Sequence, residues 1–338
     1  MTIGISGYGV YIPKLRIKKD DYAKAWGTFS AAGVGEKSVM GFDEDVLTAA
    51  AKVSKRALES VPTTADRVSR FALASTTPPY VEKLLSGTVM VSIGVPNHAL
   101  SSDHTTSTRA GTEAMLAGFE HVASNPKGLA LIAAADAPVA SMWDSFEHAL
   151  GAGAAAFVLS SENLIAELEG HASYASEYFG ERFKPRDQDL LRDLNVKKFS
   201  ESSLITNTTK AGSALLKKLN RKPEEYQHVV IQQPDARVPS TVAARLQFQE
   251  PQLAAGLTSK NIGDLGAAST AVSLAAALDA AKVGDKIFVL SYGSGAGSDA
   301  LSFKVTGERK ATHKFQAEVD RKEYIDYIKY LKLKGAIL

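Results

Sequence analysis

The sequence contains no cysteine among its 338 residues. This absence excludes disulfide bonds, a zinc ribbon, an iron–sulfur cluster and a thiolate nucleophile, because each of them depends on cysteine sulfur. The seven histidines are scattered and lack the spacing of metal-binding motifs such as HExxH. We therefore expect neither a metal site nor cysteine-based covalent chemistry in this chain.

A strong excess of charge and long apolar runs are also missing. The formal net charge is only +2, which gives no basic footprint for nucleic acid. The longest apolar runs, such as Leu129–Ala135, are too short to span a membrane. The opening segment Thr2–Pro13 has the pattern of a glycine-containing strand and not that of a signal peptide. These features predict a globular cytoplasmic protein that binds neither nucleic acid nor a membrane.

Apolar, β-rich segments alternate with alanine-rich helical segments, which is typical of an α/β protein. In the first half the pattern predicts helices at Glu44–Ser60 and Ser107–Val122, strands at Phe71–Ser75 and Leu129–Ala135, and a strand pair at Ala155–Ser160 and Ile165–His171. In the second half it predicts helices at Ser202–Leu219, Pro239–Leu246 and Ala267–Ala281, and strands at Val229–Gln233, Lys286–Tyr292 and Ala300–Val305.

The two halves repeat one order of elements: an alanine-rich helix, an apolar strand, a GAG turn and a second strand. The turns are Gly151-Ala152-Gly153 and Gly295-Ala296-Gly297, where glycine allows the chain to turn tightly. GAG tripeptides can recur by chance in a chain rich in glycine and alanine, but the shared order favours internal duplication. Only the first half carries a long connection, Ala137–Leu150, which either covers a site between the halves or packs as a surface loop.

Four separated segments carry a resemblance to a known family. They are IGISGYGVYIPKLR at 3–16, GEKSVMGFDED at 35–45, SYGSGAGSDA at 291–300 and KEYIDYIKYLKL at 322–333. They resemble, in the same order, motifs of the archaeal type of hydroxymethylglutaryl-CoA synthase, a branch of the thiolase superfamily. The resemblance covers nearly the whole chain and implies the thiolase fold, with two duplicated α/β halves in five α-β-α-β-α layers. It divides the chain into an N-terminal half at 1–165, a C-terminal half at 166–308 and a tail at 309–338.

The resemblance also implies chemistry for which this chain lacks the residues. The family needs a cysteine that carries an acetyl thioester, a glutamate that removes a methyl proton, a histidine that steers the acceptor ketone, and an asparagine near the oxyanion. The matching positions are Thr108 for the cysteine of "ACKAGT", Thr76 for the glutamate of "ESHPY", Gln232 for the histidine of "HQPN" and Asp264 for the asparagine of "IGNT".

The four replacements are poorly suited to the lost roles. A threonine hydroxyl is a weak nucleophile unless a base removes its proton, and neither Thr76 nor Gln232 is a base. His104, on the strand or loop before Thr108, is the one candidate for that task. Asp264 would repel the charge that an oxyanion hole must stabilise. We therefore expect no catalytic residues at these degenerate positions.

The substitutions Gln232-Gln233 and Gly263-Asp264 resemble those of the cysteine-less synthase-like subunit in phloroglucinol acetyltransferase-type complexes. That resemblance implies a silent subunit, homodimeric within a hetero-oligomer, that assembles with an active-cysteine thiolase and a small zinc-ribbon/OB-fold protein. A CoA thioester would serve the complex, with no cofactor bound covalently to this chain. A stripe of apolar tail residues at helical spacing packs either on its own domain or on the OB-fold partner: Tyr324, Tyr327, Ile328 and Leu331.

Two other hypotheses stay open at this point. The chain could be an active acyltransferase or synthase that uses Thr108, or that transfers the acyl group directly without a covalent intermediate. It could also be a stand-alone acyl-CoA-binding protein that reuses the family's tunnel. Acyl labelling of the purified chain favours the first of these two, and tight CoA binding by an isolated homodimer favours the second.

Overall fold

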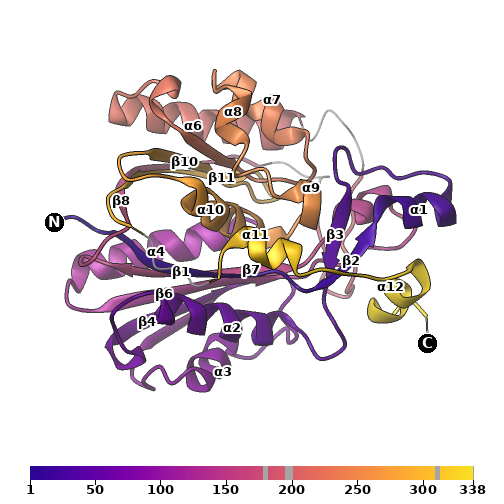
Figure 1. The fold of residues 1–338 in the computed structure, drawn as a ribbon, viewed down its shortest axis with the longest axis horizontal. Coiled ribbons are helices and arrows are strands. Elements are labelled where there is room, and N and C mark those ends of the chain that lie inside the picture. The colour runs from indigo at the N-terminus through magenta and orange to yellow at the C-terminus, as the bar shows by residue number, and fades with distance from the viewer. Residues whose placement is uncertain (178–181, 195–200, 309–312, 338) are drawn as a thin grey trace.

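The computed structural model describes residues 1–177, 182–194, 201–308 and 313–337, and its main elements follow one another in two similar runs (Figure 1). The first run consists of β1 (Gly4–Tyr11), α2 (Val46–Glu59), β4 (Val68–Ala74), α3 (Leu85–Ser92), β5 (Leu100–His104), α4 (Ala110–Ser124), β6 (Leu129–Asp136) and β7 (Gly153–Ser160). The second consists of β8 (Ala166–Ala175), α6 (Thr206–Leu219), β9 (His228–Ile231), α7 (Val238–Arg245), α8 (Glu250–Leu253), α9 (Ser259–Ile262), α10 (Ser269–Ala280), β10 (Lys286–Leu290) and β11 (Gly297–Val305).

Strand pairing repeats between the runs. The order is β5-β4-β6-β7-β1 in the first half and β8-β11-β10-β9 in the second. The parallel pair β4/β6 corresponds to β9/β10, and the antiparallel pairs β6/β7 and β7/β1 correspond to β10/β11 and β11/β8. Helix α2 packs on β1 and β7 as α6 packs on β8 and β11. Two different stretches of sequence thus form the same topology, which confirms the predicted duplication.

The two halves stack into five layers. Helices α4 and α10 lie in the middle, one half-sheet lies on each side of them, and α2 with α3 and α6 with α7 and α8 cover the outer faces (Figure 1). The half-sheets meet where β1 pairs with β8 at only two positions, Gly4 with Glu167 and Ile5 with Ala166. Through this narrow contact the strands form one continuous nine-stranded sheet that wraps around the central helices. The α-β-α-β-α arrangement expected from the resemblance is confirmed.

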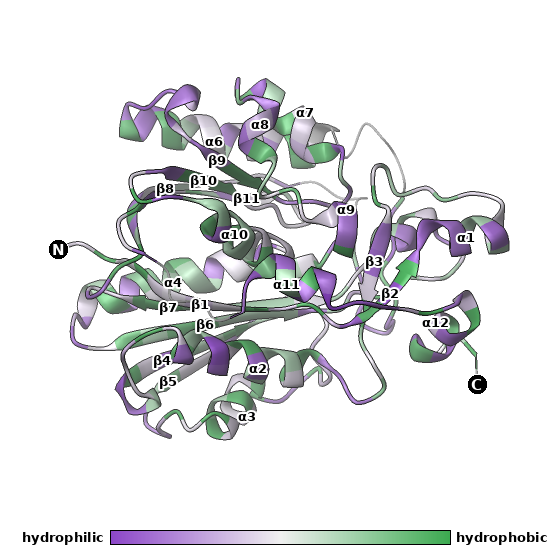
Figure 2. Cartoon of the chain, viewed as in Figure 1, coloured by the Kyte–Doolittle hydropathy of each residue, from purple (hydrophilic) through white to green (hydrophobic). Residues whose placement is uncertain are grey.

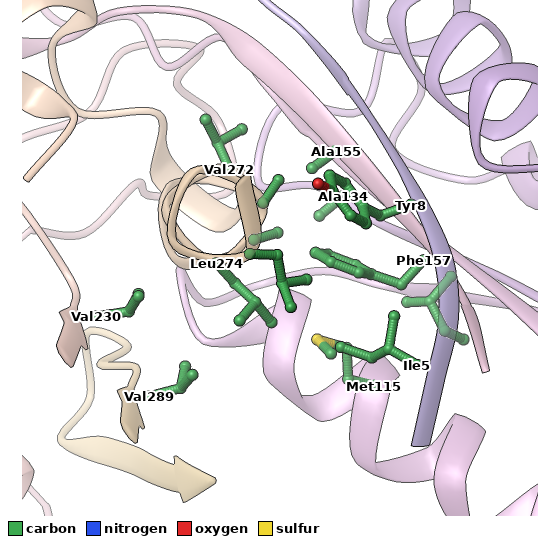
Figure 3. Close-up of a cluster of buried hydrophobic side chains, with 14 of the residues drawn as sticks. Ile5, Tyr8, Met115, Ala134, Ala155, Phe157, Val230, Val272, Leu274 and Val289 are labelled. Atoms are coloured by element: carbon green, nitrogen blue, oxygen red, sulfur yellow. The ribbon is translucent and has the colours of Figure 1, made fainter. Parts of the chain in front are cut away.

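Helix α10 is buried almost all round, because its sequence STAVSLAAALDA is apolar on every face. Ten consecutive residues, from Ser269 to Leu278, are buried. Figure 3 shows this helix end on, with Tyr8 and Phe157 of the first half on one side and Val230 and Val289 of the second half on the other. The central helices and strands are accordingly coloured mostly green or white by hydropathy (Figure 2).

The glycines of β1 allow α2 to lie directly on the strand. A Cβ atom added at Gly7 would come within 2.3 Å of the Ser60 hydroxyl oxygen, and one at Gly9 within 2.5 Å of the Val53 carbonyl oxygen. Helix α2 begins at a capping box, in which the Asp45 carboxylate accepts from the Thr48 N–H at 2.7 Å. One segment of the family resemblance thus supplies the strand of this contact, and another supplies the residue that caps the helix.

One sequence-based pairing is wrong. The strands predicted at Ala155–Ser160 and Ile165–His171 exist as β7 and β8, but β1 lies between them and pairs with both. All eight residues of β1 are buried, so this strand needs a neighbour on each side. The short connection between β7 and β8 spans that inserted strand.

The tail differs from the single amphipathic helix that was predicted. Its described part forms α11 (Phe315–Asp320), β12 (Glu323–Tyr324) and α12 (Tyr327–Leu333), while residues 309–312 and 338 lie outside the described residues. Strand β12 joins β2 (Leu15–Lys18) and β3 (Glu36–Val39) in a second sheet, next to α1 (Lys19–Trp26).

Within the tail, the predicted stripe is divided between two environments. Tyr324 belongs to β12 and is 45% exposed, and Ile328 is 58% exposed. Tyr327 and Leu331 instead pack against a small core whose centre is Tyr330, which is fully buried. The helix starts only at Tyr327, where the Asp326 side chain caps it by accepting from the Lys329 N–H at 2.7 Å. The tail therefore packs on its own domain and leaves two of the four residues of the predicted stripe on the surface.

Candidate functional site

The four positions expected to be degenerate occupy equivalent places in the two halves. Thr76 follows β4 and Gln232 follows β9, and these strands correspond in the duplication. Thr108 comes just before α4, and Asp264 comes before α10. Residues at the carboxyl ends of parallel strands and at the starts of central helices converge where a site is usually built in α/β proteins.

The short turn Gly266–Ala267, which leads into α10, connects three of these positions. Its Gly266 N–H donates to Asp264 Oδ1 at 3.0 Å, and its Gly266 carbonyl accepts from Gln232 Nε2 at 3.1 Å. The Ala267 N–H donates at 2.7 Å to Asp136 Oδ2, the atom that also accepts from the Thr76 hydroxyl at 2.6 Å. Thr76, Gln232 and Asp264 thus meet at one turn.

Asp136 is a site residue that the sequence analysis missed. It ends β6, is fully buried and accepts hydrogen bonds from the side chains of Ser75, Thr76 and Thr77 in addition to the Ala267 N–H. A carboxylate directly after the strand predicted at Leu129–Ala135 was the signal available in the sequence. Because its lone pairs are taken by donors, Asp136 serves as a junction between the halves rather than as a free base.

Thr108 is buried, with 6% of its surface exposed, and its hydroxyl donates to the Tyr292 carbonyl at 2.7 Å. Helix α4 begins two residues later, at Ala110. His104 ends β5, as predicted, and shares a 3.3 Å hydrogen bond with the Ser102 hydroxyl. Burial, with a smaller contribution from Arg70, lowers the pKa of His104. The two side chains that could have formed a nucleophile–base pair are therefore bonded to different partners.

Both ends of the Gln232 amide are hydrogen-bonded. In addition to its bond to the Gly266 carbonyl, its Oε1 accepts from the Thr270 hydroxyl at 2.7 Å. The neighbouring Gln233 is held in the same way, with Nε2 donating to Ser273 Oγ at 2.9 Å and Oε1 accepting from the Ser259 N–H at 3.0 Å. Both glutamines are buried and fasten β9 to α10 and α9.

Asp264 does not stand as an unpaired charge, and this corrects the expectation from the sequence. Arg182 Nη1 donates to its Oδ2 at 2.5 Å, and the side chains are 16% and 2% exposed respectively. Burial raises the pKa of Asp264, while Arg182 and the Gly266 N–H oppose that rise. Arg182 was missed because it lies in a segment without helical or strand periodicity. A neutralised Asp264 does not repel an oxyanion in the way that was argued.

The turn SYGSGAGSDA at 291–300 holds the start of α4. A Cβ at Gly293 would come within 1.8 Å of the Ser107 hydroxyl oxygen, and one at Gly297 within 2.4 Å of Arg109 Nη1. Arg109 Nε in turn donates at 2.9 Å to Asp299, which is fully buried. The chain before α4 thus lies directly against Gly293, where an added Cβ would also come 3.0 Å from the Arg109 backbone nitrogen.

The connection Ala137–Leu150 packs against the second sheet. Glu147 is 1% exposed and accepts from Lys37 Nζ at 2.9 Å, from the Tyr22 hydroxyl at 3.0 Å and from the Tyr330 hydroxyl. Burial lowers the pKa of Lys37 to about 8, although Glu147 opposes this. The segment GEKSVMGFDED thus reaches both the connection and the tail through one buried network. Trp143, by contrast, is 83% exposed.

Two features bear on other classes of site. Within the described residues, no group of three or more histidine, aspartate and glutamate side chains is arranged to hold a metal ion. In the same part of the chain, no helix combines the length and the apolar composition required to traverse a bilayer.

Comparison with known sequences decides the family. The chain is 31% identical to the hydroxymethylglutaryl-CoA synthase of Methanobrevibacter smithii, covering 99% of both proteins. It is 33% identical to that of Methanococcoides burtonii, covering 100% of this chain and 99% of the relative. The chain belongs to the hydroxymethylglutaryl-CoA synthase family. Residues 216–305 also match the family described as the C-terminal part of 3-oxoacyl-(acyl-carrier-protein) synthase III.

Solved structures agree on the fold of this synthase family member. An HMG-CoA synthase complexed with CoA matches with a TM-score of 0.87 at 19% identity, covering 98% of this chain and 90% of that one. The HMG synthase of the curacin biosynthetic pathway, in complex with a holo donor acyl carrier protein, matches with a TM-score of 0.86 at 19% identity, covering 99% and 88%. The thiolase-type fold expected from the resemblance is confirmed.

As a synthase family member, this chain keeps the framework of the site with different side chains. Hydroxyls and amides stand where the family resemblance places a thiolate, a carboxylate base and an imidazole, and each is bonded within the protein. Such groups can fix a backbone turn and can bind a ligand by hydrogen bonds. A hydroxyl or an amide is not a base at neutral pH, and neither contains the sulfur of a thioester.

Proposed function

We propose that the chain is a catalytically silent structural subunit of a cytoplasmic complex that transfers acyl groups or forms C–C bonds by Claisen-type chemistry on acyl-CoA. The covalent step takes place on the cysteine of a thiolase partner. A small zinc-ribbon/OB-fold protein completes the assembly. The CoA thioester is a substrate of the complex and is not bound covalently to this chain.

The observation that carries this proposal is the engagement of the hydroxyl at Thr108. A nucleophilic hydroxyl needs a neighbouring group that accepts its proton. The Thr108 hydroxyl donates instead to a peptide carbonyl, that of Tyr292, which cannot take up a proton at neutral pH. Thr76 likewise donates to Asp136. The Thr108 bond joins the two halves, and the Thr76 bond ends on Asp136, which also accepts from the Ala267 N–H of the second half.

Substrate class follows from the family and not from the site. Relatives have been solved with CoA and with a donor acyl carrier protein bound. An acyl thioester of a pantetheine carrier is therefore the class of molecule that we assign to the complex. This chain would contribute binding surface for such a molecule or for the proteins that process it.

A homodimer is supported by the outer edge of the first half-sheet. Strand β5 ends the sheet and pairs with β4 on one side only. Leu100, at the start of β5, is 53% exposed, and the chain that leads into β5 carries two more exposed apolar side chains, Val81 at 95% and Val91 at 63%. An unprotected edge of this kind is a template for pairing with a second strand. We propose that β5 of a second copy pairs here and continues the sheet.

The tail offers a smaller surface for a third protein. Tyr330 fixes α12 to the domain beneath the exposed Ile328, and pairing of β12 with β2 together with a hydrogen bond to Glu36 holds the partly exposed Tyr324. Rigid, exposed apolar side chains lose little conformational entropy on binding. We assign this surface to the small zinc-ribbon/OB-fold partner.

Purification of the tagged full-length chain from its native host, followed by mass spectrometric identification of bound subunits, tests the assembly. The expected result is co-purification of an active-cysteine thiolase and a small zinc-ribbon/OB-fold protein in fixed ratio. A matched variant, Leu100→Asp, should lose the homodimer and retain a folded subunit. Recovery of the chain as a homodimer that binds CoA tightly and carries no thiolase would contradict the proposal and support a stand-alone binding protein.

A further inference from the structure

A buried ion pair closes the region where the two halves and the Gly266–Ala267 turn meet. Arg182 Nη1 lies 2.5 Å from Asp264 Oδ2, and the other oxygen of Asp264 accepts from the Gly266 N–H at 3.0 Å. Both carboxylate oxygens are thus occupied by donors of the protein itself. A ligand donor at Asp264 therefore competes with donors that the protein already supplies.

Asp264 is fixed on its backbone side to the connection of the first half. Its N–H donates to the Ala149 carbonyl at 2.6 Å, and its carbonyl accepts from the Gly151 N–H at 2.8 Å. A Cβ at Gly151 would lie 1.9 Å from the Ile262 carbonyl oxygen, so the two chains run in direct contact. These bonds fix the backbone of Asp264 and thus the point from which its carboxylate reaches Arg182.

Arg182 comes from a hairpin that is attached to the same connection. Phe183 and Arg192 exchange backbone hydrogen bonds of 2.9 and 2.8 Å, and the Leu191 N–H donates to the Val139 carbonyl at 2.9 Å. Leu191 is buried in a small apolar cluster with Ala140 and Leu150. The hairpin therefore rests on the connection 137–150, with Arg182 at its inner end.

The guanidinium group also lies against the site turn. Gly266 has φ +55, and an added Cβ would come 2.3 Å from Asp136 Oδ2 and 3.3 Å from Arg182 Nη2. Among the described residues, this second nitrogen of Arg182 is buried and has no hydrogen-bond partner. Arg182 thus brings a positive charge close to two buried carboxylates, at the turn that joins three of the four degenerate positions.

We propose that Arg182 is a positioning residue that closes this site from within. Its guanidinium takes the place of a ligand beside Asp264 and holds the 182–192 hairpin on the 137–150 connection. The Gly266 N–H donates to the carboxylate that Arg182 holds, and the Ala267 N–H donates to Asp136, so an acyl oxygen is excluded from both. This inference rests on the proposed function, since a site closed by its own side chain suits a subunit that does not turn over substrate there.

A double-mutant cycle in the full-length protein tests the pair. Removal of Arg182 alone leaves a buried, unpaired carboxylate, whereas Arg182→Met/Asp264→Asn removes both charges. Arg182→Met should therefore lower the melting temperature by several degrees, and the double variant should recover most of that loss. Arg186→Met, at an exposed arginine of the same hairpin, is the matched control and should change little. The proposal would be overturned if the loss in the double variant equalled the sum of the losses in Arg182→Met and Asp264→Asn.

The pH dependence of stability in Arg182→Met distinguishes an ion pair with Asp264 from a role of Arg182 in packing alone. The groups facing Asp264 are Arg182, Asp136 and the Gly266 N–H. Without Arg182, the already raised pKa of Asp264 rises further, and an acid with a raised folded-state value loses stability as pH increases through that value. The deficit of Arg182→Met should hence be smaller at pH 5 than at pH 8. An equal deficit at both pH values would overturn the assignment.

Ligand exclusion is measured with acetoacetyl-CoA as the probe, by calorimetry on the folded wild-type and double-variant proteins. The double variant should bind at least about tenfold more tightly, which corresponds to about 1.4 kcal/mol. Equal affinity of the two proteins would overturn the exclusion. This outcome is distinct from failure of the proposed function, which would appear as a covalent acyl adduct on the wild-type chain.

Discussion

Thr76 and Asp136 are joined by a 2.6 Å hydrogen bond in which the threonine hydroxyl is the donor. The bond connects a position that the family resemblance reserves for a base with a carboxylate at the end of β6. The same carboxylate oxygen accepts from the Ala267 N–H in the second half. A position that would handle protons in an active relative is thus part of the contact between the two halves here.

Asp136→Asn should destabilise the fold itself, and this effect should be measurable with no ligand present. The amide nitrogen of asparagine cannot accept the hydrogen bonds that one carboxylate oxygen now receives, so at least one buried donor loses its partner. We expect a loss of about 2 to 4 kcal/mol in the free energy of unfolding, measured by chemical denaturation. The matched control is Asp187→Asn, at an exposed aspartate. Equal effects of the two substitutions would contradict the role assigned to Asp136.

Local sequence pattern located many of the main elements and the duplication, but it did not predict α3, β5 or the second sheet. Helices such as α2 and strands such as β6 were predicted to within a few residues, because period and burial are properties of short segments. The order of neighbouring strands in the sheet was not predicted, because strand pairing depends on segments that are distant in the sequence. Strand β1 lies between β7 and β8 in the sheet, although it precedes them by more than a hundred residues in the sequence.

The site was only partly predictable for a related reason. Thr76, Thr108, Gln232 and Asp264 could be located by resemblance, but their hydrogen-bond partners could not. Asp136 and Arg182 carry no motif, and their importance arises only when the halves stack. The tail was misread because the pattern of Tyr324 and Tyr327 fits a helix, whereas pairing with β2 favours a strand at Tyr324.

Thr108→Cys should not restore condensation. A thiol near the start of α4 can become acylated slowly, because a helix N-terminus lowers thiol pKa. Thr76 still cannot remove the methyl proton, and Gln232 cannot act as an acid. We expect no hydroxymethylglutaryl-CoA from acetyl-CoA and acetoacetyl-CoA in a chromatographic assay, with Ser107→Cys as the neighbouring control. Appreciable product from the single Thr108 variant would show that a base is present that we have not identified.

The buried pair Lys37 and Glu147 should give a measurable pH dependence. Burial lowers the pKa of Lys37 to about 8, against an ordinary value of 10.5 in the unfolded chain. Between these values the unfolded state binds more protons than the native state, so this lysine's contribution to stability rises with pH. Relative to Lys37→Met/Glu147→Gln, the wild type should gain about 1 kcal/mol per pH unit between pH 8 and 9.5. If the free energy of unfolding changes with pH in the same way for both proteins across this range, the lowered pKa of Lys37 is refuted.

The tail surface can be separated from the tail core by substitution. Ile328→Asp changes a side chain that is 58% exposed, so it should leave the melting temperature nearly unchanged and weaken co-purification of the small partner several-fold. Val283→Asp, at a residue that is 60% exposed elsewhere, is the matched control and should keep the partner. Tyr330→Ala should instead destabilise the fold, by about 3 kcal/mol or more, because it empties a fully buried position. Retention of the partner by Ile328→Asp would remove the tail from the interface.

The central claim is that this chain does not carry the acyl group, and intact-protein mass spectrometry tests it most directly. The wild-type chain and Thr108→Ala are each incubated with acetyl-CoA, alone and within the purified complex, and the mass of every subunit is measured. The account predicts an unmodified mass for both forms of this chain and an acetyl adduct only on the thiolase cysteine. An acetyl adduct on the wild-type chain that maps to Thr108 and is lost in Thr108→Ala would contradict it.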